Sequence, residues 1–198
     1  IGFAEGSRPT ERGFDEFLGH ASGNMDYYHH AYNGKHDLHL GTEPYHADGT
    51  YSTDLFADAA IEFVRAQSDS GKPWFCYLPF NAPHFPNAKN KRPEQINQWQ
   101  APDDAFDNYP FSAEETDPHR RYMAVVTALD TASGRVIDAV DRLGGEKTFV
   151  FWCSDNGAFD LHRKGIDVGS NEPLRNGGVT CWEGGIRVPA IARWLTHI

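Results

Sequence analysis

Apolar side chains recur every three or four positions between residues 52 and 70. They are Leu55, Phe56, Ala59, Ala60, Phe63 and Val64. This spacing gives a helix one continuous apolar face. Ser52 and Thr53 are residue types that cap the free N–H groups of a helix start, and Ser70-Gly71-Lys72-Pro73 is a stop signal. The pattern therefore predicts a helix that begins at Ser52 and Thr53 and ends at about Ser70.

A second helical pattern covers residues 120–143 and is followed by Gly144-Gly145, which ends it. The positions of its apolar face are Met123, Val126, Leu129, Val136, Ile137, Val140 and Leu143. We expect this face to lie against the protein core.

Three other segments, residues 74–79, 148–153 and 186–194, are short apolar runs without helical spacing. Such runs are typical of strands that are covered on both faces. Helix and strand alternate along the chain, which is the pattern of an α/β sheet with helices on both faces. In such sheets, polar groups just beyond the carboxyl ends of strands form the functional site.

Two long segments show neither pattern. Residues 1–50 are rich in Gly, His, Tyr and Asn, and we interpret them as loops with a turn at residues 12–15. Their histidines are irregularly spaced, which favours surface or loop positions over a metal site. Residues 85–118 contain many Pro, Asn and Asp, which predicts a long surface excursion that is either functional or a simple insertion.

Acidic side chains outnumber basic ones by 28 to 18, and the formal net charge is −10. This balance argues against a nucleic-acid partner, because binding a phosphate backbone requires a basic surface. It also argues against docking on an anionic membrane surface. The charge is compatible with a hard cation and equally with ordinary solubility. There is no stretch of about 18 apolar residues, so we expect no membrane span.

Polar residues follow two of the expected strands. His84 follows residues 74–79 and lies between Pro83 and Pro86, which stiffen the backbone around a group suited to an anion. Local hydrogen bonding of this histidine is the alternative. Asp155 and Asn156 follow residues 148–153 and offer two hard oxygen ligands for Ca²⁺ or Mg²⁺, although Asp-Asn-Gly is also a common turn. Two ligands cannot fill a coordination sphere of about six to eight oxygen atoms, so a metal here requires ligands from elsewhere.

Seven segments, taken in order, resemble the sulfatase family of the alkaline-phosphatase superfamily. Each is weak alone, but the ordered set covers nearly the whole chain and is specific. The segments are residues 12–19 (RGFDEFLG), 51–56 (YSTDLF), 83–84 (PH), 127–130 (TALD), 154–157 (SDNG), 173–175 (PLR) and 182–189 (WEGGIRVP). Within the last, the glycines permit close backbone approach, and Glu183 and Arg187 are expected to pair.

The resemblance implies an alkaline-phosphatase-like α/β fold, with a mixed, mostly parallel sheet sandwiched by helices that is incomplete in this chain. The chain starts at Ile1 without an initiator Met or signal-peptide pattern. We therefore expect residues 1–198 to be part of a single sulfatase catalytic domain, truncated at both ends. The implied activity is sulfuric ester hydrolysis on a sulfated carbohydrate or aryl ester. Because family members are commonly exported, the resemblance implies a periplasmic or secreted protein.

In this family, a Cys or Ser within Cys/Ser-x-Pro-x-Arg becomes formylglycine, whose hydrated form attacks sulfur while Ca²⁺ holds the sulfate oxygens. The resemblance matches Asp155 and Asn156 to the later pair of metal ligands, with Ca²⁺ favoured over Mg²⁺. It matches His84 to the catalytic, substrate-binding histidine near the leaving-group oxygen. A cation and a histidine donor at these places stabilise the charge that grows on the oxygens.

Three family features are absent from the chain. It contains no Cys/Ser-x-Pro-x-Arg motif and lacks the paired N-terminal Asp ligands, so formylglycine is expected upstream. Gly178 occupies the position, five residues before Glu183, where the family usually has a sulfate-binding lysine. We hypothesise that Lys164 or Arg175 supplies this charge instead, or that the substrate group differs.

The leading hypothesis is a sulfatase whose isolated chain shows no turnover because it lacks the nucleophile. Its partner is a sulfated small molecule or polysaccharide, with no nucleic acid and no membrane. The alternatives are a phosphate or phosphonate ester hydrolase of the same superfamily and a non-catalytic relative that keeps the metal for binding. A plain α/β domain whose motifs coincide by chance is the remaining alternative.

Overall fold

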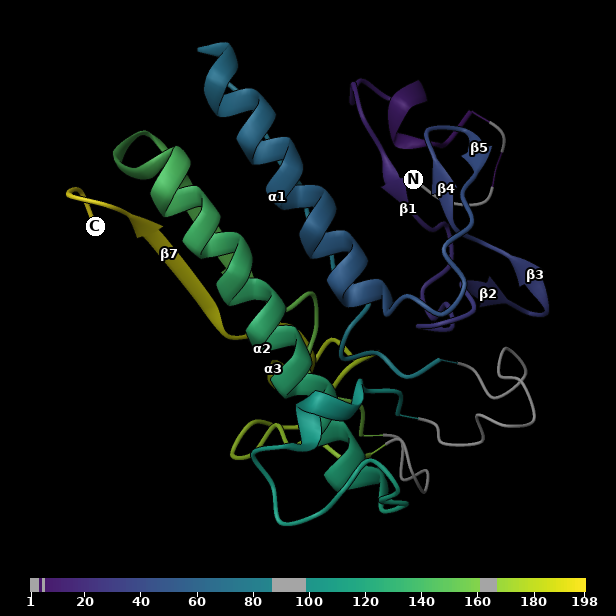
Figure 1. Ribbon diagram of the computed structural model, residues 1–198. Coiled ribbons are helices and arrows are strands. Elements are labelled where there is room, and N and C mark those ends of the chain that lie inside the picture. Colours follow the sequence, from purple (N-terminus) through teal and green to yellow (C-terminus); the bar gives the residue numbers. More distant parts are fainter. Residues whose placement is uncertain (1–3, 5, 87–98, 161–166) are drawn as a thin grey trace.

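Two helices form the centre of the structure, and short strands and loops surround them (Figure 1). The computed structural model describes residue 4 and residues 6–86, 99–160 and 167–198. Helix α1 spans Ser52–Ser70 and helix α2 spans Pro118–Leu143, and the two pack side by side. Both predicted helices are confirmed, with α2 beginning slightly earlier than expected because Asp117 caps it by accepting from Arg120 N at 2.9 Å.

The start of α1 differs from the expectation in its side chains. Tyr51 is the N-cap, and no side chain caps the first turn. Ser52 and Thr53 are the first helical residues and are fully buried, and Ser52 Oγ donates to Asn81 Oδ1 at 3.3 Å. The predicted capping role is therefore wrong, because Ser52 is directed toward a neighbouring loop. The helix ends as predicted, at Gly71 with a φ of 68°.

The buried face of α2 is not the face that the large aliphatic side chains predict. Its members are Arg121, Ala124, Val125, Ala128, Ala132, Ala139 and Val140. Val140 alone among them belongs to the predicted face, and Val126 and Leu143 are exposed. The cause is the shape of the neighbours, since Ala124 and Ala128 pack in one cluster with the rings of Tyr51, Trp99 and Phe106. Large rings close-pack only where the helix presents small side chains.

Ion pairs tie α2 to the elements on both of its sides. Arg135 pairs with Asp54 at 3.1 Å and also with Asp58, both on α1. Arg193 forms a two-bond pair with Asp141 of α2, at 2.7 and 2.8 Å. These contacts hold α1 and the C-terminal strand against α2. Figure 1 shows the C-terminal strand, labelled β7, running beside α2.

The two C-terminal strands form an antiparallel pair. Strand β6 (Phe149–Cys153) places Phe149 opposite Trp194 and Cys153 opposite Ala190 of strand β7 (Ala190–Trp194). The strand predicted at residues 148–153 is confirmed. The strand predicted from residue 186 begins later, because Glu183–Ile186 forms the short helix α3. Residues 74–79 belong to no strand.

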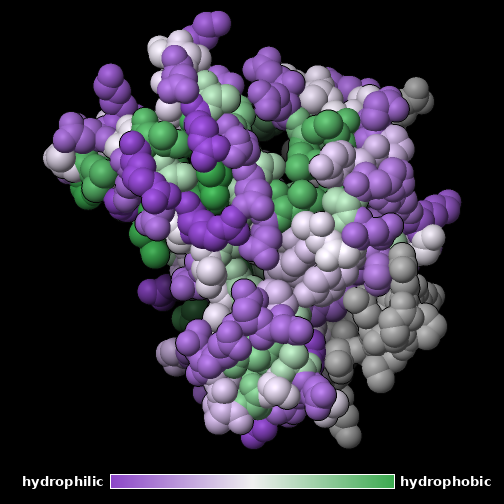
Figure 2. All heavy atoms as spheres, in the orientation of Figure 1, coloured by the Kyte–Doolittle hydropathy of each residue, from purple (hydrophilic) through white to green (hydrophobic). Residues whose placement is uncertain are grey.

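The apolar runs are open to solvent instead of being covered on both faces. Phe75 is 71% exposed and Phe151 is 60% exposed. Figure 2 shows apolar side chains at the surface near the end of α2 and β7. In the part of the chain that the structure describes, all paired strands are antiparallel, unlike the mostly parallel sheet expected. The predicted burial is wrong there because the described residues supply no second layer over these strands.

Residues 6–50 contain five two-residue strands that sequence patterns do not reveal. One sheet has the order β1 (Leu18–Gly19), β4 (His39–Leu40), β5 (Glu43–Pro44), and a second pairs β2 (Ala31–Tyr32) with β3 (Lys35–His36). Both lie beside the start of α1 (Figure 1). The interpretation as surface loops is wrong for His30, which is fully buried and donates from Nε2 to Thr50 O at 3.0 Å.

Residues 87–98 of the predicted excursion lie outside the described part. Its described part, residues 99–117, has little regular structure, as predicted, but Trp99, Ala105 and Phe106 are buried in the core, so the excursion does not stay at the surface. It contains a short 3-10 helix at Asp103–Phe106, and others occur at Pro9–Glu11 and Gly145–Lys147. The buried guanidinium of Arg121 holds the excursion to α2 by donating to the carbonyls of Trp99, Ala113 and Glu115. Among the described residues, no helix combines the length and apolarity that crossing a membrane requires.

Candidate functional site

His84 lies on a tight turn that follows residues 74–79. Its backbone N–H donates to Asn81 O at 2.8 Å, and the Ala82–Pro83 bond inside the turn is cis. Its carbonyl accepts a hydrogen bond of 2.6 Å from the hydroxyl of Tyr27. His84 Nδ1 lies 2.8 Å from Phe85 O. Because a carbonyl only accepts, Nδ1 carries the proton, and Nε2 is the ring nitrogen that remains for a ligand.

Asp155 and Asn156 lie on the loop that leaves the end of β6. Asp155 Oδ1 accepts the Asn156 N–H at 2.9 Å, and Ser154 Oγ donates to Asn156 O at 2.8 Å. Gly157 N donates to Gly185 O at 3.1 Å, which anchors the loop to the segment around α3. Asp155 and Asn156 are both exposed, so their remaining side-chain oxygens are accessible to a ligand.

Phe159 brings the two predicted parts of the site together. Its ring meets that of His84 edge-on, with centroids 5.6 Å apart, and contacts the ring of Phe85 at 5.7 Å. Phe159 lies three positions after Asn156 on the same loop. The turn that carries His84 and the loop that carries Asp155 and Asn156 are therefore in contact, as the strand-end argument predicts.

Gly178 packs directly against this loop. Its N–H donates to Ala158 O at 2.7 Å, and it forms an isolated parallel bridge with Phe159. A β-carbon at this position would lie 2.5 Å from Gly157 O and 3.0 Å from Asn156 Oδ1. The position at which the family usually has a lysine therefore has no room for a side chain. A β-carbon at Gly184 or Gly185 would lie even closer to neighbouring backbone than one at Gly178, which confirms the predicted tight approach.

Of the two residues considered as replacements for that lysine, the structure describes Arg175. Its guanidinium carbon lies 3.5 Å from the ring centroid of Trp182, and both side chains are exposed. Arg175 O also accepts from Gly184 N at 2.9 Å, which fixes the residue to the α3 segment. Lys164 lies outside the described residues. Nearby, Glu183 and Arg187 pair as expected, at 4.0 Å.

The oxygen atoms of Asp155 and Asn156 fit a hard cation in type. Among the described residues, no group of three or more His, Cys, Asp or Glu side chains is arranged to hold a metal ion. A carboxylate and an amide oxygen on an exposed loop can supply only part of a calcium sphere. The chain thus offers two oxygen ligands whose chemistry fits Ca²⁺, and a calcium ion here would need further ligands from another segment.

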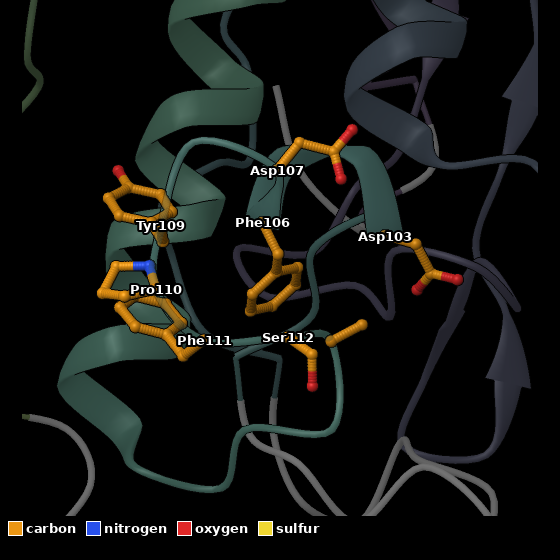
Figure 3. Close-up of a pocket in the computed structure, with 8 residues that line it drawn as sticks. Asp103, Phe106, Asp107, Tyr109, Pro110, Phe111 and Ser112 are labelled. Carbon is orange, nitrogen blue, oxygen red and sulfur yellow. The ribbon is translucent and has the colours of Figure 1, made fainter.

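An open hollow lies away from these residues, on the excursion before α2 (Figure 3). Phe106 points into it, and Tyr109 and Phe111 stack beside it with centroids 4.9 Å apart. The carboxylates of Asp103 and Asp107 lie at its edge. Neither His84 nor Asp155 lines this hollow, so it is separate from the candidate site.

Sequence reasoning did not identify Phe159 as part of the site, nor the hydrogen bond from Tyr27 to the backbone of His84. Tyr27 reaches His84 across 57 positions, and Phe159 reaches it across a strand and a helix. No local pattern encodes contacts of this range. The aromatic character of residues 27–28 and 159 is the one signal in the sequence.

Comparisons with known proteins give consistent matches. A family model named Sulfatase matches residues 2–198. Arylsulfatase J of Mus musculus is 34% identical over 90% of this chain and 28% of its own length. N-acetylgalactosamine-6-sulfatase of Rattus norvegicus is 34% identical over 74% of this chain and 24% of its own length. The chain thus spans about a quarter of the curated relatives that it matches.

Among solved structures, the crystal structure of Ps i-CgsB in complex with k-i-k-neocarrahexaose matches this chain with a TM-score of 0.80 and 26% sequence identity. The match covers 100% of this chain and 43% of the Ps i-CgsB chain. The same protein in a second crystal structure matches with a TM-score of 0.79. The α/β, alkaline-phosphatase-like fold class is confirmed by these neighbours, and the small sheets of this chain are an incomplete version of it.

Proposed function

The chain belongs to the sulfatase family, and on this premise we propose that the full-length protein releases sulfate from a sulfated carbohydrate. The observation that carries the proposal is the ring contact between His84 and Phe159, at 5.6 Å. This contact brings the candidate ester-binding histidine next to the loop with the two oxygen ligands. A site that holds a sulfate ester requires both a cation and a hydrogen-bond donor at one place.

His84 is the proposed donor to the oxygen that leaves with the sugar. Its Nδ1–H is held by Phe85 O at 2.8 Å, which fixes the ring orientation and leaves Nε2 as the nitrogen that can donate to an ester. When the ring is protonated, Nε2–H donates to the bridging oxygen and stabilises the negative charge that develops as the sulfur–oxygen bond breaks. The leaving oxygen takes the proton from Nε2 as its bond to sulfur breaks. One water is consumed over the whole reaction, and the products are sulfate and the free hydroxyl.

Asp155 and Asn156 are the proposed ligands of Ca²⁺ within this chain. When bound, the cation supplies positive charge to the sulfate oxygens. The hydrogen bond from Asn156 N to Asp155 Oδ1 holds the carboxylate in place at the loop. The remaining ligands and the formylglycine nucleophile are proposed to come from segments outside this chain.

The proposed substrate class is a sulfated carbohydrate. The relatives include proteins named N-acetylgalactosamine-6-sulfatase, and one solved neighbour is a complex with a neocarrahexaose. The exposed Arg175 and Trp182 beside the site suit such a substrate, since a guanidinium binds sulfate and an indole packs on a sugar ring. Arg175 is accordingly proposed to supply the charge that Gly178 cannot.

The test is an assay of the full-length protein, produced in cells that form formylglycine. Sulfate release is measured with carrageenan oligosaccharides, N-acetylgalactosamine 6-sulfate and 4-nitrophenyl sulfate, and phosphate release with 4-nitrophenyl phosphate. We expect sulfate release that is lost after chelation and restored by Ca²⁺. Cleavage of the phosphate ester alone would favour the phosphoesterase alternative. Calcium binding without turnover of any ester would favour the non-catalytic relative.

Two variants with matched controls locate the activity. His84→Ala is expected to lower kcat about 100-fold or more, as loss of a general acid does. His119→Ala, which removes an exposed histidine from the first turn of α2, leaves kcat unchanged. Asp155→Ala weakens Ca²⁺ affinity, whereas Asp138→Ala on the exposed side of α2 does not. Equal kinetics of the His84 variant and its control would contradict the proposal.

A further inference from the structure

The hydroxyl of Tyr27 holds the backbone on which His84 is mounted. It lies 2.6 Å from His84 O and 3.1 Å from Asn81 O. A phenol has one proton to donate, so the shorter bond to His84 O is the stronger. Tyr27 is 1% exposed, which removes competing water. Burial raises the pKa of the Tyr27 hydroxyl well above its usual value, so the group remains a neutral donor.

Tyr27 is itself fixed from several sides. Its N–H donates to Gln100 Oε1 at 3.0 Å, and Gln100 Nε2 donates to Asp26 Oδ2 at 2.8 Å. Asp26 is fully buried, and its Oδ1 accepts two backbone N–H groups of the next turn. The Tyr27 ring stacks on Tyr51 with centroids 5.3 Å apart. A rigid chain of contacts therefore connects the Asp26 turn to the His84 turn.

We propose that Tyr27 is a positioning residue that sets the orientation of the His84 ring for catalysis. The proposal rests on the proposed function of His84 and deepens it. The side chain of Tyr27 fixes the His84 carbonyl, the adjacent Phe85 O fixes Nδ1, and the two constraints together direct Nε2. Losing the first constraint frees the backbone that links His84 to Phe85, so Phe85 O, the acceptor of Nδ1, can shift relative to the His84 ring. Displacing a catalytic group by about 1 Å costs up to about 100-fold in rate.

The decisive variant is Tyr27→Phe in the full-length protein, with Tyr51→Phe as the matched control. Tyr51 is also buried, and its hydroxyl also donates to a backbone carbonyl, Gln100 O at 3.1 Å, but it does not contact His84. Both variants lose one buried hydrogen bond and keep the ring. We expect Tyr27→Phe to lower kcat about tenfold or more with little change in KM. Tyr51→Phe keeps kcat within about twofold of the wild type.

A second readout does not depend on turnover. The ring resonances of His84 are compared by NMR at one pH in the wild type and both variants. We expect changed chemical shifts of the His84 ring in Tyr27→Phe, because its orientation changes, and unchanged ones in Tyr51→Phe. Replacing Tyr27 with 4-aminophenylalanine restores a donor, so this protein recovers part of the lost kcat. Should Tyr27→Phe not fold, the protein with 4-aminophenylalanine at position 27 is compared directly with Tyr51→Phe. Because an aromatic amine is a weaker donor than a phenol, we expect the protein with 4-aminophenylalanine to have the lower kcat of the two.

The outcomes separate the two proposals. If the wild type cleaves no sulfate ester, the proposed function fails, and the His84 resonances alone decide whether Tyr27 positions the ring. If Tyr27→Phe and Tyr51→Phe have the same kcat and the same His84 ring resonances, the positioning role is wrong. Equal loss of kcat in both variants, with unchanged His84 resonances, would also overturn it, because the effect would then be general destabilisation.

Discussion

Gly178 and Asn156 are packed so closely that a β-carbon at position 178 would lie 3.0 Å from Asn156 Oδ1. The N–H of Gly178 also donates a hydrogen bond to Ala158 O at 2.7 Å. The backbone at position 178 is thus bonded directly to the loop that carries Asn156. The absence of the family lysine is therefore more than a missing charge. The backbone at 178 is part of the support for a proposed calcium ligand.

We predict that Gly178→Ala weakens calcium binding and stability together. The added methyl pushes on Gly157 O, which is 2.5 Å from its position, and on the Asn156 side chain. Overpacking of this kind costs about 1–3 kcal/mol in the free energy of unfolding. Calorimetric Ca²⁺ titration and urea unfolding of the full-length protein measure the two effects.

The control variant, Gly134→Ala, is expected to change stability in the opposite direction. Gly134 lies inside α2 with nothing within 4 Å of a β-carbon, so Gly134→Ala should raise stability by about 0.5–1 kcal/mol without changing Ca²⁺ affinity. Wild-type Ca²⁺ affinity in Gly178→Ala would show that the 178 backbone does not support Asn156.

A second prediction concerns Arg175, whose guanidinium lies 3.5 Å from the centre of the Trp182 ring. If Arg175 holds a sulfate oxygen, Arg175→Ala raises KM for a sulfated oligosaccharide by about tenfold, as expected for one charge-assisted hydrogen bond. Arg187→Ala removes a neighbouring exposed cation that pairs with Glu183 at 4.0 Å, and it serves as the control. Identical KM values for the two variants would show that Arg175 does not bind the sulfate group. Lys164→Ala would then be tested next.

Arg121 carries the third prediction, which concerns stability. Its Nε donates to Trp99 O at 2.7 Å, and its Nη1 donates to Ala113 O at 2.8 Å and Glu115 O at 3.1 Å. Arg121→Ala removes these bonds and leaves buried carbonyls without donors, so we expect a loss of about 2–3 kcal/mol. Urea unfolding of Arg120→Ala provides the comparison, because Arg120 is exposed and pairs with Glu115 at the surface. Similar losses in both variants would show that the buried bonds contribute little.

The helices and the site loops could be predicted because their signals are local. The end of α1 is encoded by Gly71, which takes a left-handed conformation that favours glycine. Asp155 and Asn156 follow β6, as polar groups at a strand end should. His84 follows residues 74–79, which form no strand in the described structure. The contact of their loops through Phe159 agrees with this argument.

The buried face of α2 could not be predicted because its partners lie far away in the sequence. The large side chain of Val126 indicates a buried position, yet Ala124 and Ala128 are buried instead, against rings such as Trp99 and Phe106. Shape complementarity between distant segments decided the outcome. The burial of residues 74–79 and β6 was wrongly predicted for a related reason. A strand is buried only where other elements pack over its faces, and the described residues supply no such elements.

A fourth prediction concerns pH and His30, which is fully buried. Desolvation lowers the pKa of His30 below 6.5, and His36 lowers it further, while the bond to Thr50 O and the carboxylates of Asp48 and Asp26 act in the opposite direction. Nδ1 is buried and has no hydrogen-bond partner among the described residues, so a proton there would be unpaired. The unfolded chain takes up this proton below about pH 6.5 while the folded chain does not, so stability falls as the pH is lowered.

His30→Gln should therefore reduce the loss of stability between pH 7.5 and pH 5.5, by at most about 1.4 kcal/mol per pH unit. Urea unfolding at several pH values measures the slope. His119→Gln on the exposed start of α2 should leave it as in the wild type. An unchanged slope in His30→Gln would mean that other groups cause the acid sensitivity. His20, whose pKa burial also lowers, would be the next to replace.

The last prediction is that residues 1–198 alone release no sulfate from any ester, although they carry His84, Asp155 and Asn156. The sequence contains no Cys/Ser-x-Pro-x-Arg motif, so it cannot form the formylglycine that is proposed to attack sulfur. Asp155 and Asn156 supply two ligands of a sphere that needs about six to eight, so Ca²⁺ binding should also be weak. Purified chain is assayed beside the full-length protein, with circular dichroism to establish that α1 and α2 are formed. Sulfate release above the blank would show that the chemistry does not require formylglycine, and His84 would then be the first residue to test as the attacking group.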